Sequence, residues 1–351
     1  MKLRARTSLI AVTLLTAVAS ATSGQAIDED RKILALDGAA GDALGSSIAL
    51  AQGIIAVGAP GDDDNGANSG SVYLLNASTG AQIAKLLPTD GAAGDSFGFS
   101  VAFDGAVVAV GAPGDDDNGA ASGSAYLFDA STGAQLGKLL AVDGGAGDEF
   151  GYSIAIDNGV VAVGSIRDDD LADDSGSAYL FDASTGSQLI KLLPDDDGNR
   201  SFGISMAMDG GVVAIGARMH FDLDQGFTLD AVYLFDASSG DQLHKLMANN
   251  GTWTDFFGTA VDIDNGLVAV GAWARSIFFD HSGAAYVFDV STGEQLHYFY
   301  PADGHDRDHF GNSISIDDGI VAVGAHQDGD RGWVAGSAYL FDALDGTQID
   351  K

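Results

Sequence analysis

The stretch KLLPTDGAAGDSFGFSVAFDGAVVAVGAPGDDDNGAASGSAYLFDASTGAQL, from Lys85 to Leu136, decides the fold because the chain repeats it six times. The residues that open the six copies are Lys32, Lys85, Lys138, Lys191, Lys245 and Tyr298. Counted to Lys351, five of the six steps are 53 residues and one is 54. Self-similarity at this period predicts a repeat architecture rather than two ordinary domains.

Each copy contains four short segments with the composition of β-strands, separated by turn residues. In the second copy the segment before the Asp104–Gly105 turn alternates, and the next is a continuous β-branched run typical of a strand buried on both faces. The four segments are Phe97–Phe103, Val107–Val110, Ser124–Asp129 and Gln135–Leu140. Four antiparallel strands at this period predict a propeller blade, so we expect an all-β, six-bladed β-propeller.

The residues FG, VVAVGAP and GSAYLFD, read in that order, resemble the FG-GAP repeat of integrin α-type propellers. The resemblance covers Lys32 to the C-terminus and is most faithful at Gly58–Pro60 and Gly111–Pro113. It implies a propeller and a binding or adhesion role. Integrin-type repeats carry a calcium loop between the first and second strands, where this chain has only Asp104–Gly105, so the resemblance does not carry calcium to that place.

The two ends of the repeat region predict how the ring closes. Arg31–Leu36 has the pattern of a fourth strand, whereas Gln348–Lys351 is a shortened version of it. We therefore expect the N-terminal strand to complete the last blade and to remove two free sheet edges.

The first 26 residues have the pattern of a secretory signal peptide, which leaves residues 27–351 as the propeller. Lys2, Arg4 and Arg6 precede a short apolar run, and Ala19–Ala21 fits a cleavage site. The alternative is an N-terminal membrane anchor, although the run is short for a span. The pattern predicts a secreted, periplasmic or cell-surface protein that is not inserted in the membrane after cleavage.

The amino-acid composition argues against several classes of partner and of chemistry. The chain has no cysteine and a net charge of −34. These values argue against disulfides, thiol catalysis, and nucleic acid or anionic membrane as partners. We expect a monomer that binds an extracellular protein or a glycan.

Strand parity places the loops between second and third strands at the same end as the crossings between blades. Three of these loops carry runs of Asp, whose hard oxygen atoms suit Ca²⁺. The candidate metal ligands are Asp62, Asp63, Asp64, Asp115, Asp116, Asp117, Asp168, Asp169 and Asp170. The alternative is a set of solvated turns, because tight turns favour Asp, Asn and Gly. Calcium is thus a possible cofactor, and we expect no organic cofactor.

The same end collects all three Trp residues and, beyond Arg31, every Arg, mostly in copies four to six. Such divergence on one face indicates a binding site, although drift after duplication is the alternative. The candidate ligand-binding residues are Arg218, Trp253, Trp273, Arg275, His326 and Trp333.

Familiar catalytic motifs are missing from the sequence: it has no HExxH, no G-x-S-x-G and no phosphate-binding loop. With 50 acidic residues, any single carboxylate pair is uninformative. The favoured interpretation is a binding or adhesion module. The alternatives are a carbohydrate-active enzyme (a lyase or glycosidase) on a propeller and a structural component of an extracellular matrix.

Overall fold

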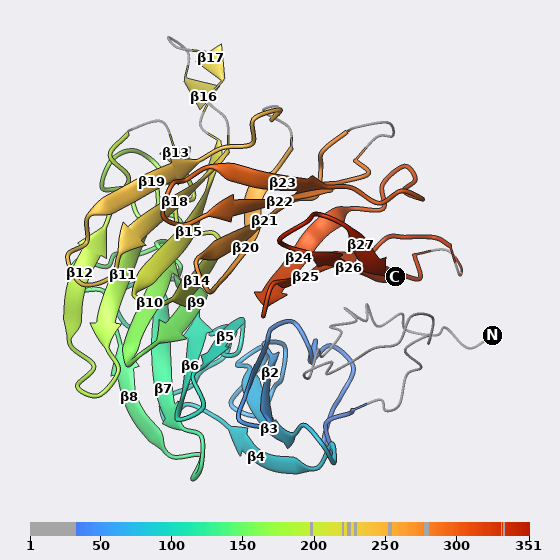
Figure 1. Ribbon diagram of the computed structural model, residues 1–351. Coiled ribbons are helices and arrows are strands. Elements are labelled where there is room, and N and C mark those ends of the chain that lie inside the picture. The colour runs from blue at the N-terminus through green and yellow to red at the C-terminus, as the bar shows by residue number, and fades with distance from the viewer. Residues whose placement is uncertain are drawn as a thin grey trace.

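A computed structural model describes residues 33–351 except 197–198, 220, 223–225, 228–229, 252–254, 277–280, 331 and 333. It confirms the six-bladed, all-β propeller: six antiparallel sheets follow one another around a common axis (Figure 1). The predicted signal peptide lies outside the described residues. Within the described part of the chain, no helix is long and apolar enough to cross a membrane.

The blades use the strands in chain order. Blade 1 contains β1 (Ile48–Ala51), β2 (Ile54–Ala59), β3 (Ser71–Asn76) and β4 (Gln82–Leu86). Blade 2 contains β5 (Ser100–Phe103), β6 (Val107–Ala112), β7 (Ser124–Asp129) and β8 (Gln135–Leu139). Blade 3 contains β9 (Phe150–Asp157), β10 (Val160–Ser165), β11 (Ser177–Asp182) and β12 (Gln188–Leu192).

The second half follows the same plan. Blade 4 contains β13 (Asn199–Arg200), β14 (Met206–Asp209), β15 (Val212–Met219), β18 (Ala231–Asp236) and β19 (Gln242–Leu246), and between β15 and β18 lies a hairpin of β16 (Phe221–Asp222) and β17 (Gly226–Phe227). Blade 5 contains β20 (Phe257–Asp264), β21 (Leu267–Ala272), β22 (Ala284–Asp289) and β23 (Gln295–Phe299). Blade 6 contains β24 (Phe310–Asp317), β25 (Ile320–Ala325), β26 (Ser337–Asp342) and β27 (Gln348–Asp350).

The first strands of successive blades contact one another from β1 to β24, so they line the axis. The second and third strands are sandwiched between neighbouring blades, which explains their continuous apolar runs. The fourth strands form the rim and are only partly buried.

A Phe-Gly dipeptide joins each of blades 2 to 6 to the blade before it. Phe97 is fully buried and packs edge-on against Tyr126 and Phe128 in a core that both blades share. Gly98, with φ of 88°, then lets the backbone press against the preceding blade. A Cβ on Gly58 would lie 2.0 Å from the Gly98 carbonyl oxygen, so the second-strand glycine must lack a side chain.

The ring closes differently from the sequence expectation. β27 pairs with β26, so the C-terminal segment itself supplies the fourth strand of blade 6. The described part of the N-terminal segment forms no strand, and Ile33 and Ala35 pack on the apolar face of blade 1 instead. Arg31 and Lys32 lie outside the described residues. The prediction was wrong because both chain ends carry the fourth-strand pattern and only one can occupy the edge of β26.

One face of blade 6 is less covered than the matching face of blade 1, which packs on blade 2. Ala322, Ala338 and Leu340 are partly exposed, whereas Ala56 and Leu74 at two of the same positions in blade 1 are fully buried. Within the described part of the chain, this face of blade 6 is therefore less covered than the faces between consecutive blades.

We expect Phe150→Ala to lower the free energy of unfolding by about 3–5 kcal/mol, because it empties a fully buried site between two blades. Phe150→Leu should cost much less, since blade 1 carries Leu44 in this slot. Phe99→Ala, at a ring that is 37% exposed, is the control. Urea denaturation measures all three, and equal losses for Phe150→Ala and Phe99→Ala would contradict the role of the dipeptide.

Candidate functional site

Lysines of the fourth strands hold the acidic loops together. Lys138 Nζ lies 2.9 Å from Asp90, 2.9 Å from Asp115 and 2.6 Å from Asp117. The same three-carboxylate arrangement surrounds Lys85 (Asp37, Asp62, Asp64), Lys191 (Asp143, Asp168, Asp170) and Lys351 (Asp303, Asp328, Asp330). Each group joins a fourth strand or the residue after it to a 2–3 loop and to a crossing (in blade 1, to the N-terminal segment), so the predicted common end of these loops is correct.

A tyrosine of the third strand completes each group. The Tyr126 hydroxyl donates to Asp115 at 2.8 Å, and Lys138 Nζ lies 5.0 Å from the centre of the Tyr126 ring. Burial raises the pKa of Asp115, but hydrogen bonds from Lys138 and Tyr126 outweigh it and the pKa falls below its usual value. Burial likewise lowers the pKa of Lys138, but bonds to Asp117 and its other partners raise it overall. The group is therefore an ion cluster that stays charged at neutral pH.

The three Asp residues of each loop do different work. Asp115 and Asp117 point to the ammonium, whereas Asp116 accepts the backbone N–H of Ala121 at 2.7 Å within the loop. Asp63 and Asp169 make the same loop-internal bond as Asp116. Of the three predicted metal ligands in one loop, two therefore contact the lysine and one bonds to the backbone of its own turn.

Blade 5 replaces this ion cluster by another pair. Tyr298 stands in the lysine position, and Arg275 stands where the other loops have their first Asp. The Arg275 guanidinium lies 2.6 Å from Asp255, whose carboxylate is almost fully buried. Arg275, a predicted ligand-binding residue, therefore forms an ion pair with a buried carboxylate of its own blade.

Three other predicted residues come together across blades 4 to 6. Arg218 covers the ring of Phe256 at 4.4 Å, and Phe256 stacks on Trp273 at 4.8 Å with an interplanar angle of 13°. Trp273 lies 4.7 Å from His309, which lies 5.2 Å from His326. We call Arg218, Phe256, Trp273, His309 and His326 the aromatic ladder. Trp253 and Trp333 lie outside the described residues.

Two repeated positions build the ladder. Phe256 and His309 directly precede the Phe-Gly dipeptide and have φ of 53° and 57°. Arg218, Trp273 and His326 occupy the position that Pro113 holds after the second strand of blade 2. Sequence reasoning did not name Phe256 and His309 as candidates, because residues beside the core dipeptide look like part of the core. The same position holds the small residue Ser96 in blade 2, and this difference could have marked them as candidates.

The histidines make the blade 6 end of the ladder sensitive to pH. Burial lowers the pKa of His309 to about 4, and the neighbouring His326, His281 and Arg307 act in the same direction. Burial also lowers the pKa of His326. The rings are therefore neutral at pH 7.

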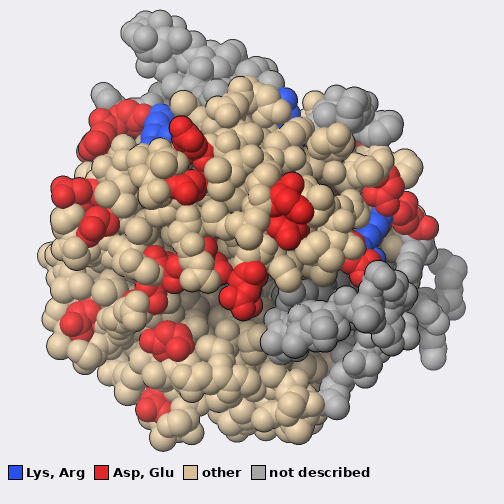
Figure 2. All heavy atoms as spheres, in the orientation of Figure 1, with Lys and Arg blue, Asp and Glu red and all other residues tan. Residues whose placement is uncertain are grey.

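The ladder contrasts with the composition of the chain, which has 50 acidic residues and 16 basic ones. Acidic side chains are scattered over the face in Figure 2, and basic ones are few. A guanidinium and a row of aromatic rings form a different surface from the acidic rest of the protein.

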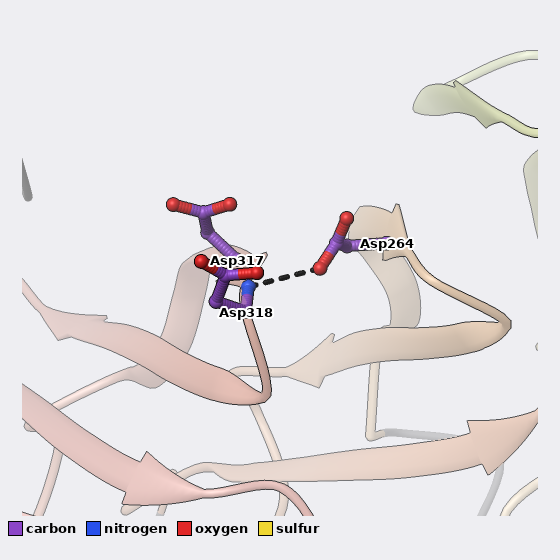
Figure 3. A group of neighbouring side chains, drawn as sticks. All are labelled: Asp264, Asp317 and Asp318. Carbon is purple, nitrogen blue, oxygen red and sulfur yellow. Dashed lines mark hydrogen bonds between the residues drawn. The ribbon is translucent and has the colours of Figure 1, made fainter. Parts of the chain in front are cut away.

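A second acidic group lies at the opposite end of the blades. Asp264, Asp317 and Asp318 occupy the hairpin turns of blades 5 and 6, with carboxylate oxygens within 4.8 Å of one another (Figure 3). Asp264 accepts the Asp318 backbone N–H at 2.9 Å, as Asp209 accepts that of Asn265. This repeated bond links the turns of neighbouring blades and accounts for how close the side chains lie.

Comparison with known proteins agrees with the fold. A family model described as "FG-GAP repeat" matches residues 27–75, 81–128, 134–181, 241–288 and 295–341, which together make up more than half of the chain. The segment without a match includes most of blade 4, where the extra hairpin is inserted. No curated protein matches. The crystal structure of the computationally designed Ika8 protein is similar, with a TM-score of 0.51 and 16% identity over 80% of this chain and 67% of that one.

We expect Lys138→Met to destabilise the protein by about 3 kcal/mol, because it leaves three carboxylates without their cation, one of them buried. Added Ca²⁺ should recover part of the loss in the variant and change the wild type little, since Nζ occupies the centre of the carboxylates. Thermal melts with calcium or EDTA measure both effects. Equal calcium responses in the two proteins would show that the lysine does not fill this position.

Stability should fall as the ladder is acidified. The pKa of His309 is about 4 in the folded protein against an ordinary 6.5, so the unfolded chain binds the proton more readily and the fold loses stability as pH falls from 6.5 to 4. His309→Phe keeps a ring beside Trp273 but cannot titrate, so its melting temperature should fall less over this interval. A fall as steep as in the wild type would rule out His309 as a contributor.

Proposed function

The chain belongs to the FG-GAP repeat family, and from that premise we propose that it is a binding or adhesion module. Its recognition surface is the end of the propeller that carries the 2–3 loops and the crossings between blades. The partner is an extracellular protein or a glycan. The family supports the general role, and the ladder supports the location.

The aromatic ladder is the observation that carries this proposal. Core packing does not require it, since Ser96 and Pro113 fill its two positions in blade 2 without loss of the fold. Half-buried aromatic rings beside an Arg are the side chains that contribute most to binding energy at protein interfaces. Three consecutive blades contribute to the ladder, so it offers one continuous surface.

Secretion and calcium remain parts of the proposal. The leader-like residues 1–26 favour export to the periplasm, the cell surface or the medium. Calcium at the acidic loops would have to compete with the ammonium groups of Lys85, Lys138 and Lys191 for the same oxygens. We therefore propose that calcium supports binding only in a secondary role.

We expect Trp273→Ala to weaken binding to any glycan or extracellular protein by roughly thirtyfold or more, since truncation of a central aromatic residue costs about 2 kcal/mol or more. Pro113→Ala, at the matching position of blade 2, should leave binding unchanged. A glycan array and a secreted-protein array, followed by calorimetry on any hit, provide the measurement. Hits that bind Trp273→Ala as tightly as the wild type would move the site away from the ladder.

A further inference from the structure

Within the part of the chain that the structure describes, Arg218 lacks the acidic partner that seven other cations have. Its guanidinium covers the Phe256 ring, and no described carboxylate lies within ion-pair distance of it. The other described cations with an assigned ion pair are Lys85, Lys138, Lys191, Lys245, Lys351, Arg167 and Arg275. Although the chain has 50 acidic residues, the described ones leave this half-buried guanidinium without a counter-ion.

The contact of Arg218 with an aromatic ring suits the binding of an anion. A guanidinium that stacks on an aromatic ring keeps its planar N–H edge free, and this edge matches the two oxygens of a carboxylate. Stacking also fixes the side chain in advance, so that less rotamer freedom is lost on binding. The contact with Phe256 therefore prepares Arg218 for a ligand.

The blades on either side of Arg218 carry aromatic side chains at this end. Towards blade 6 lie Phe256 and Trp273. On the other side, in blade 3, lies Tyr152, whose ring centre is 4.9 Å from that of Phe99 in blade 2. Burial and Glu149 raise the pKa of Tyr152, whereas the charges of Arg218 and Arg167 lower it. Aromatic rings beside the Arg218 guanidinium fit a ligand with a compact ring and a single acidic group.

The overall charge limits how acidic the ligand can be. At −34 the protein repels a long polyanion, whereas one carboxylate meets only the local field because charges beyond about 8 Å are screened at physiological salt. Resting on the proposed function, we propose that Arg218 binds the carboxylate of a single uronic acid unit in an otherwise neutral glycan, with the aromatic side chains beside it packing against the sugar ring.

The test titrates the full-length protein with methyl β-D-glucuronide and methyl β-D-glucoside, which differ only in the carboxylate, and follows binding by ligand-observed NMR. We expect the glucuronide to bind at least about tenfold more tightly, as for a hydrogen bond to a charged group. Arg218→Gln should abolish this preference and Arg218→Lys should keep part of it. Arg167→Gln, which removes the same charge from an arginine already paired with Glu149, should leave the preference intact.

The outcomes separate this inference from the proposed function. Equal binding of the two glycosides, with loss of both in Trp273→Ala, overturns the role of Arg218 but leaves a binding module. A glucuronide preference that survives in Arg218→Gln also overturns it. Binding of neither glycoside, or binding of a peptide with a free C-terminal carboxylate but not of the amidated peptide or the glucuronide, overturns the assignment to an acidic sugar.

Discussion

The structure depends on the close approach of one blade to the next at the Phe-Gly dipeptide. Phe97 fills the space between two sheets, while Gly98 and Gly58 let the two backbones meet where a side chain would collide. A larger residue at either glycine would separate the blades, and a smaller one at the phenylalanine would leave a cavity. Because this contact recurs from blade to blade, it fixes the rotation between successive sheets and therefore the positions of all loops.

Charge is managed separately from this apolar joint. Each three-carboxylate group is compensated by a lysine that reaches it from the fourth strand, with a tyrosine hydroxyl as a further donor. Blade 5 pairs Arg275 with Asp255 instead and has Tyr298 in the place of the lysine. Two chemically different solutions in one ring show that the loop sequence can change when its partner on another strand changes too.

The repeat predicted the blades, their strand order and the common end of the loops, because these follow from local hydrophobic pattern and turn chemistry. It did not predict the closure, since the segments beginning at Arg31 and at Gln348 have the same pattern and their competition for β26 is a tertiary matter. The repeat placed Arg275 and Arg218 in one group of candidates. In the structure Arg275 forms an ion pair with the buried Asp255, 20 positions earlier, whereas Arg218 lies over the Phe256 ring. Phe256 and His309 were overlooked because their side chains gain a role only through neighbours on adjacent blades.

The ladder also has a modular geometry. Each blade presents one residue before its dipeptide and one after its second strand, and the ladder alternates between the two kinds of position as it passes from blade to blade. These positions tolerate serine, proline, arginine, tryptophan and histidine on an unchanged scaffold. Each blade of the propeller therefore has two surface positions that can be exchanged without changing the scaffold. If the side chains at these two positions were moved to the next blade, the recognition surface would rotate about the axis and the hydrophobic interior would stay the same.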